Sequence, residues 1–180
     1  MRVRDLTLTA LFAALTAVGA YLSVPNPWAP TVPFTLQVFA IFLAGSLLGA
    51  RLGFWSQVVY LALGALGLPV FAGGTGGFAH LLGPTGGYLF SFPLLAAVTG
   101  VLSAGQAGFA RLVAADLAGL AVNFALGVAG LAVFGHLAWM TALGIAAMYL
   151  PYDAVKAVMA AAIAVAVRRA VRVPAAEISR

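Results

Sequence analysis

Three long stretches of the chain contain no charged residue, and they restrict the possible folds more than any other feature of the sequence. Residues 6–50, 52–110 and 117–152 lack Asp, Glu, Lys and Arg, which gives uncharged runs of 45, 59 and 36 residues. An average soluble domain is roughly 25% charged, whereas this chain is 7% charged. Since one helical crossing of a bilayer needs about 20 apolar residues, the sequence predicts an integral membrane protein with about six crossings.

Clusters of Pro, Gly and Arg divide the chain into apolar segments of the length that a membrane helix needs. A backbone in lipid must satisfy its own hydrogen bonds, and these Ala- and Leu-rich segments lack the alternation of barrel strands. We therefore expect helices. The prediction is an all-α integral membrane protein with one domain, residues 1–180, that forms a six-helix bundle with spans near 6–23, 34–50, 52–68, 86–103, 112–134 and 150–167.

The cations indicate how this bundle is oriented. The connections near 24–33, 69–85 and 135–149 contain no Lys or Arg. The positive-inside rule therefore predicts that both termini are cytoplasmic. Because the cations lie beside apolar segments, we expect the net charge of +5 to reflect membrane topology and not nucleic-acid binding. Eight of the nine cations fall on the predicted inner side: Arg2, Arg4, Arg51, Arg111, Arg168, Arg169, Arg172 and Arg180.

Two of the outer connections have unusual compositions. Pro fixes φ and removes a donor, so the first connection is expected to be stiff and irregular, and it is a candidate lid. Glycines let a backbone turn sharply and approach a ligand closely, which makes the connection at 69–85 a candidate cavity wall. The alternative is that both are simple outer loops. The residues concerned are Pro25, Pro27, Pro30 and Pro33 around Trp28, and the glycines at 73, 74, 76, 77, 83, 86 and 87.

Asp153 and Lys156 are the most informative polar pair in the chain. They are three residues apart after Pro151, so they share one face of the predicted last helix. Ionisable residues within spans are costly and are functional candidates by default, although a mutual ion pair near the interface is the alternative. A carboxylate and an ammonium one turn apart suit a ligand with a donor-rich head and a separate anionic group. Gln37, close to Thr35, is expected to face the same cavity.

The remaining polar residues exclude several functions. The chain has four carboxylates, no cysteine, and no Gly followed by Lys, so we expect neither an enzyme, nor a metal site, nor an ATPase. Asp116 near Arg111 is expected to form an inner structural pair, and Asn123 an interhelical hydrogen bond. Asp116 is also the one candidate for an ion pathway. A self-sufficient secondary transporter or channel for a small organic anion therefore stays open, as do an intramembrane enzyme and a purely structural subunit.

Small residues recur at helical spacing and let another helix approach closely. They serve either packing within the bundle or an external partner. They are Ala10, Ala13, Ala14 and Ala17 in the first span, and Gly45, Gly49 and Gly53 around the second inner turn.

Four segments carry a resemblance to a known family: Val32–Gln37 after the Pro-rich connection, Gly67–Gly74, Gly83–Leu89 and Leu150–Ala157. In this order and spacing they resemble the BioY family, the biotin-binding S components of energy-coupling factor (ECF) vitamin transporters. The resemblance covers nearly the whole chain. It implies biotin capture from outside and uptake across the cytoplasmic membrane of a prokaryote, with a transmembrane coupling subunit and two ATPase subunits as partners.

The resemblance also implies residue roles. Biotin has a ureido ring with two N–H donors and a valerate carboxylate, so Asp153 is expected to accept from the ring and Lys156 to face the carboxylate. Ala10 and Ala14 match the spacing of the family's contact with the coupling subunit. Tyr152 stands where the family often has glycine, and its ring is expected to narrow the pocket. The implied site has biotin as ligand, no cofactor and no metal, and consists of Asp153, Lys156, Gln37, Thr35, Gly73, Gly74, Gly77, Gly86, Gly87 and Tyr88.

Overall fold

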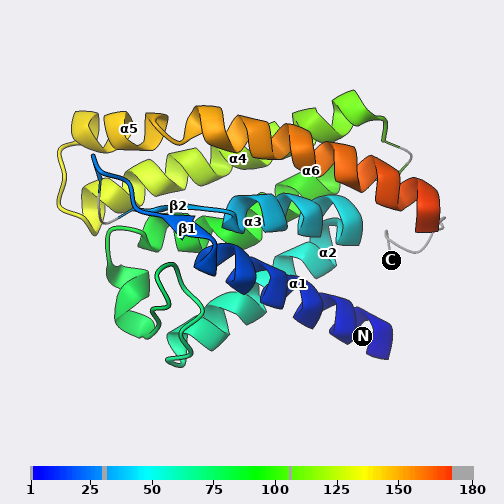
Figure 1. Cartoon of the computed structure of the whole chain (residues 1–180), viewed down its shortest axis with the longest axis horizontal. Coiled ribbons are helices and arrows are strands. Elements are labelled where there is room, and N and C mark those ends of the chain that lie inside the picture. Colours follow the sequence, from blue (N-terminus) through cyan, green and yellow to red (C-terminus); the bar gives the residue numbers. More distant parts are fainter. Residues whose placement is uncertain (1, 30–31, 106, 172–180) are drawn as a thin grey trace.

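The structure, a computed structural model, describes residues 2–29, 32–105 and 107–171. Pro30 of the candidate lid, and Arg172 and Arg180 of the inner cations, lie outside the described residues. The elements are α1 (Val3–Tyr21), β1 (Ser23–Val24), β2 (Phe34–Thr35), α2 (Gln37–Ala65), the 3₁₀ helix η1 (Phe78–Leu82), α3 (Gly86–Leu102), α4 (Phe109–Val133), α5 (Trp139–Ala147) and α6 (Leu150–Val171) (Figure 1).

Helix α2 contains two of the predicted spans, which are separated by a sharp reversal at Gly49. Gly49 has φ 78° and ψ 177°, a conformation that is essentially restricted to glycine. The two halves run antiparallel, because Gln37 at the start of α2 donates a hydrogen bond of 2.6 Å to the hydroxyl of Tyr60 near its end. In a straight helix these residues would be about 34 Å apart. The reversal at Gly49 lies close to the predicted boundary between spans 34–50 and 52–68.

The helices form the bundle that the uncharged runs predict. Among the described residues, α1, α2, α4 and α6 are long and apolar enough to cross a membrane, and the apolar helix α3 is shorter at 17 residues. With α2 counted as two halves, these helices correspond to the six predicted spans. The chain is thus an all-α, multi-pass membrane protein. The predicted connection at 135–149 differs from expectation because it contains α5, whose nine residues are too few to cross.

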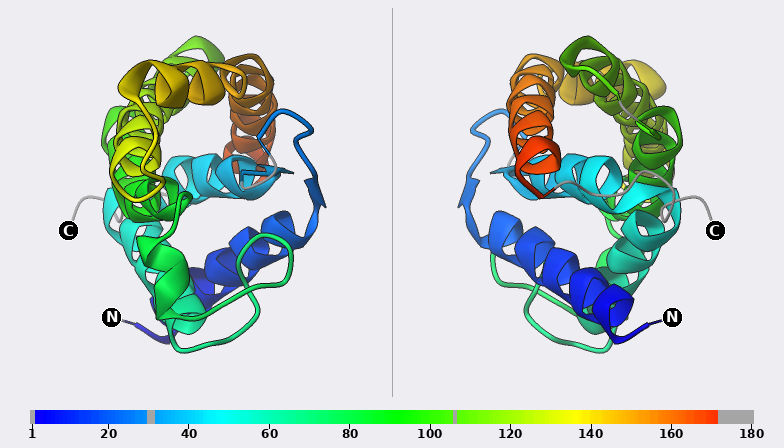
Figure 2. Two further views of the ribbon diagram at one scale, coloured as in Figure 1. Left: turned by 90° about the vertical axis from the view of Figure 1, so that its left-hand side faces the viewer. Right: turned by 90° about the vertical axis from the view of Figure 1, so that its right-hand side faces the viewer.

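One end of the bundle holds the start of the first helix, the end of the last helix and two of the connections. The start of α1 and the end of α6 lie at the same end of the molecule (Figures 1 and 2). At this end Arg168 of α6 contacts the carbonyl oxygens of Ser46 and Gly105, so the reversal within α2 and the connection between α3 and α4 also lie there. The opposite end holds β1, β2 and the start of α6 (Figure 1).

Small residues on α2 pack the bundle internally, whereas those on α1 are divided between buried and exposed positions. An ideal Cβ at Gly45 would lie 2.6 Å from the carbonyl oxygen of Ala96, so only glycine permits this approach of α2 to α3. On α1, Ala13 is buried, whereas Ala10 and Ala14 are exposed. Of the two uses predicted for small residues, packing accounts for Gly45 and Ala13, and the Ala10–Ala14 face is left open.

The reversal at Gly49 gives a prediction about stability. Replacing Gly49 with Ala would force a side chain into a strained conformation, which costs about 1–3 kcal/mol. We expect Gly49→Ala to lower the thermal unfolding midpoint of the purified protein in detergent. Gly144→Ala is the matched control, since an added Cβ there meets nothing within 4 Å. Equal midpoints for the two variants would contradict this account of the turn.

Candidate functional site

A cavity of about 110 Å³ lies where the two irregular connections meet α2, α3, α4 and α6. This space holds several water-sized volumes, and its walls are largely apolar with a few convergent polar groups. The lining residues are Val32, Pro33, Thr35, Gln37, Val38, Phe71, Ala72, His80, Thr85, Tyr88, Leu89, Phe92, Asn123, Tyr149, Asp153 and Lys156.

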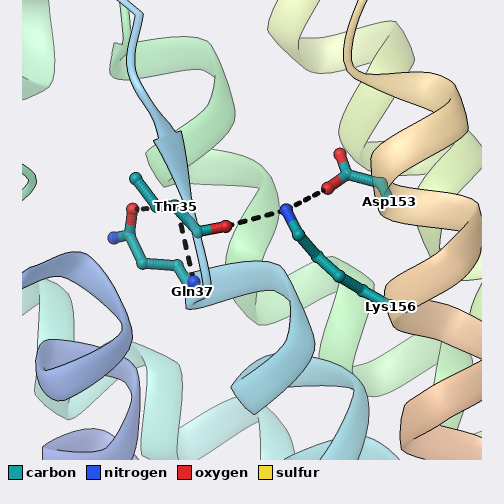
Figure 3. Close-up of polar contacts among 4 residues, drawn as sticks. All are labelled: Thr35, Gln37, Asp153 and Lys156. Atoms are coloured by element: carbon teal, nitrogen blue, oxygen red, sulfur yellow. Dashed lines mark hydrogen bonds and ion pairs between the residues drawn. The ribbon is translucent and has the colours of Figure 1, made fainter. Parts of the chain in front are cut away.

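The predicted pair on α6 forms one edge of the cavity and joins that helix to β2. The Nζ of Lys156 lies 2.7 Å from Oδ1 of Asp153 and donates a second hydrogen bond of 2.7 Å to the carbonyl oxygen of Thr35 (Figure 3). The side chains of Lys156 and Asp153 are 13% and 8% exposed. Since one turn of helix separates them, the predicted i, i+3 geometry is confirmed. The ammonium is thereby shared between a carboxylate and a backbone carbonyl.

Gln37 connects this edge to the glycine-rich connection. Its Oε1 accepts a hydrogen bond of 2.9 Å from the Thr35 hydroxyl, and its Nε2 donates one of 2.6 Å to Tyr60. The Tyr60 hydroxyl in turn donates a bond of 3.1 Å to the carbonyl oxygen of Val70. These hydrogen bonds link β2 to residue 70. The buried amide of Gln37 therefore fixes the cavity wall at β2 relative to the wall in the glycine-rich connection. Thr35 and Gln37 both line the cavity, as expected.

The Pro-rich connection is held against the bundle by a buried tyrosine. Nδ2 of the buried Asn26 donates a hydrogen bond of 2.7 Å to the hydroxyl of Tyr149, which itself donates to the carbonyl oxygen of Val32. Oδ1 of Asn26 accepts a bond of 2.9 Å from the backbone N–H of Trp28. Burial raises the pKa of the Tyr149 phenol, so it stays a neutral donor. These bonds keep Val32 and Pro33 at the cavity wall.

The hydrogen bonds of Tyr149 are predicted to make a measurable contribution to the free energy of unfolding. In Tyr149→Phe the buried amide of Asn26 and the carbonyl of Val32 lose a partner, and an unsatisfied buried group costs about 1–3 kcal/mol. We expect a lower unfolding midpoint and faster hydrogen exchange in the peptide that contains residues 25–29. Tyr152→Phe is the control, because the Tyr152 side chain is exposed. Unchanged exchange in Tyr149→Phe would show that these bonds do not hold the connection.

Two polar groups from α3 and α4 also reach the cavity. Tyr88 lines it, and the buried hydroxyl of Tyr88 has no hydrogen-bond partner among the described residues. Asn123 accepts a bond of 2.7 Å from the Ser91 hydroxyl, which confirms the expected interhelical hydrogen bond. Asn123 also lines the cavity, which its position on an apolar helix did not predict. An unpartnered buried hydroxyl is a group that a ligand can satisfy.

The aromatic wall was not predicted from the sequence. The rings of Phe71 and His80 stack with centroids 5.9 Å apart, and Nε2 of His80 lies 2.9 Å from the Thr75 hydroxyl oxygen. Phe92 adds a ring from α3. The signal available in the sequence was the position of Phe71 and His80 within the glycine-rich connection. Their side-chain directions depend on turns that the sequence alone does not specify.

Five predicted glycines lie outside the cavity lining. Gly87 lies in the first turn of α3, where a Cβ would be 2.2 Å from the carbonyl oxygen of Leu126, so it permits close packing of α3 on α4. Gly86 is buried beside the backbone of Leu81 in the same way. Gly73 and Gly74 have positive φ in a tight turn, and Gly77 donates a backbone bond to α2. These glycines shape the backbone of the walls, and neighbouring residues supply the side chains that line the cavity.

Two further expectations are corrected by the structure. The Tyr152 ring is 56% exposed and packs against Phe34 with centroids 4.8 Å apart, so it does not narrow the cavity. Asp116 does not pair with Arg111, whose Nε donates instead to the carbonyl oxygen of Leu102. Asp116 is fully buried and accepts a bond of 3.2 Å from the Ser46 hydroxyl. The helix register turns Asp116 inward, while Arg111 lies on the exposed side.

The described residues thus define an all-α, multi-pass membrane protein with a small, polar-edged cavity near one end of its bundle. The BioY family model matches residues 1–173, and the chain belongs to this family. The chain is 46% identical over 165 residues to the probable biotin transporter BioY of Pyrococcus horikoshii, covering 91% of this chain and 96% of the relative. It is 42% identical over 171 residues to the biotin transporter BioY of Thermotoga maritima, with 93% and 97% covered.

A solved structure has the same fold. The crystal structure of the S-component for biotin from an ECF-type ABC transporter superposes with a TM-score of 0.84 and 29% sequence identity. The match covers 93% of this chain and 92% of that chain. The similarity therefore extends over most of both chains.

Proposed function

We propose that this chain is the substrate-specific S component of an ECF-type transporter, which captures biotin from outside and carries it across the cytoplasmic membrane of a prokaryote. The observation that carries the proposal is the Asp153–Lys156 pair at the edge of a small-molecule cavity. Relatives that share more than 40% identity over most of the chain are named biotin transporters, and the similar solved structure is an S-component for biotin.

The chemistry of the cavity suits biotin. Asp153 offers a carboxylate to the two ureido N–H groups, because only Oδ1 accepts a bond from Lys156 among the described residues. The ammonium of Lys156 binds the valerate carboxylate. This contact replaces its hydrogen bond to the carbonyl oxygen of Thr35. The free hydroxyl of Tyr88 supplies a further polar partner, and Phe71 and Phe92 supply apolar walls for the sulfur-containing ring.

This assignment predicts binding by the isolated chain. A hydrogen bond to a charged group contributes about 1.5–3 kcal/mol, so we expect Asp153→Asn and Lys156→Met each to weaken biotin binding by about 10- to 100-fold. The measurement is equilibrium binding of labelled biotin to the purified chain in detergent, without partner subunits. No covalent change to biotin is expected, because the chain acts as a transport subunit and not as an enzyme.

Two controls make this measurement specific. Asp5→Asn removes a carboxylate at the opposite end of the bundle and should bind like the unmodified chain. An unrelated vitamin should not compete with labelled biotin. Failure of the folded, unmodified chain to bind biotin would reject the proposal, and wild-type affinity in Asp153→Asn would reject the assigned site.

The orientation and partners form the second part of the proposal. The positive-inside rule supports cytoplasmic termini, with the cavity end outside. The exposed face of α1 that carries Ala10 and Ala14 supports close helix packing with a transmembrane coupling subunit. Two ATPase subunits would supply the energy, since this chain has no phosphate-binding loop.

The α1 face gives a prediction that separates docking from biotin binding. We expect Ala14→Trp to leave biotin affinity unchanged and to abolish co-purification with the coupling and ATPase subunits, because a bulky side chain prevents close helix approach. Ala121→Trp on α4 is the control at another exposed alanine. Normal complex formation by Ala14→Trp would place the docking face elsewhere. Biotin accumulation in vesicles without any ATPase would instead indicate a self-sufficient transporter.

A further inference from the structure

At the end of the bundle opposite the cavity, one arginine side chain joins several elements to each other. Nε of Arg168 donates a hydrogen bond of 3.0 Å to the carbonyl oxygen of Ser46, and Nη2 donates to the same oxygen. Nη2 also donates a bond of 3.0 Å to the carbonyl oxygen of Ser103, and Nη1 one of 3.2 Å to that of Gly105. Arg168 therefore connects α6 to α2, to the end of α3 and to the connection that follows it.

These acceptors are positioned to attract a cation. Ser46 lies three residues before the break at Gly49, in the last turn of the first half of α2, and Ser103 is the C-cap of α3. The carbonyl groups at a helix C-terminus carry the negative end of the helix dipole. A guanidinium has five donors in a rigid fork, so one side chain bonds to both helix ends simultaneously.

A buried acidic side chain lies beside this cluster. Asp116 of α4 is fully buried and accepts a bond of 3.2 Å from the Ser46 hydroxyl. Its Oδ2 has no hydrogen-bond partner among the described residues. Burying such groups is expensive unless they are paired. Ser46 thus contacts both side chains, with its hydroxyl on Asp116 and its carbonyl on Arg168.

The buried face of α6 explains what this cluster does. The face begins at Asp153 and reaches Arg168 in steps of three and four residues, and the buried residues between them are all alanines: Ala157, Ala160, Ala161 and Ala164. Alanine methyl groups let the neighbouring helices approach closely, and they form only low ridges for packing into grooves. Directional polar contacts at the two ends of the face are then what set the register of α6 against α2 and α4.

We propose that Arg168 is a positioning residue, which fixes the inner end of α6 and thereby sets where Asp153 and Lys156 stand at the cavity. Fifteen residues separate Asp153 from Arg168, about 22 Å along the helix. A rigid helix with a smooth face transmits a shift at one end to the other. Release of the Arg168 contacts frees α6 to move relative to β2. The inference rests on the proposed function only for its binding measurement.

The test measures the position of α6 directly and the binding of biotin separately. The chain has no cysteine, so Val155→Cys on α6 and Phe78→Cys on η1, both exposed, accept a spin-label pair at the cavity end. We expect Arg168→Gln to broaden or shift the distance distribution between the labels and, in the unlabelled chain, to weaken labelled-biotin binding about tenfold. Arg169→Gln, the exposed neighbour, should change neither.

A second variant keeps the test valid if Arg168→Gln does not fold. Arg168→Lys retains the charge and loses the fork, so it should fold and show a smaller change of the same kind in both measurements. Wild-type distances and affinity in both Arg168 variants would overturn the inference. A lower unfolding midpoint with unchanged distances would also overturn it, because the role would then be stability alone. If the unmodified chain fails to bind biotin, the proposed function fails, and the distances alone decide on Arg168.

Discussion

The ammonium group of Lys156 joins the elements around the cavity, and the site depends on its three-way contact with Asp153 and Thr35. A charge removed from water needs partners that replace its hydration. Here one partner is one helical turn away on α6, and the other is a carbonyl oxygen on β2, more than a hundred residues earlier in the chain. The contact therefore ties the first connection to the last helix. A ligand that binds there has to compete with this contact or extend it.

The bilayer imposes a second constraint, which explains where the irregular backbone lies. Peptide groups at membrane depth must be satisfied within the protein. The two irregular connections meet this requirement with side chains: Asn26 and Tyr149 for the first, and Gln37 with Tyr60 for the second. The same buried amides and hydroxyls that satisfy the backbone also hold the cavity walls in place.

Local rules predicted much of this architecture. Span lengths, the break near residue 50 and the pairing of Asp153 with Lys156 follow from composition and helical periodicity, because each involves residues close in sequence. Other features were mispredicted. The glycines at 86 and 87 were assigned to the lining, but they serve helix packing, and Asp116 was assigned to Arg111 but contacts Ser46. In each case the deciding contact comes from a different helix, and its register is not encoded locally.

The sequence by itself determined that this protein is a helical membrane bundle with one polar pair on its last helix, because long uncharged runs have few stable solutions in lipid. It also determined the family, since the four spaced motifs can be recognised without any knowledge of contacts. Only the tertiary structure decided which side chains line the cavity, how Tyr149 holds the first connection, and that Arg168 joins α6 to two helix ends. These contacts span up to 123 residues, and their geometry depends on helix rotation and backbone turns that exist only after the bundle has packed.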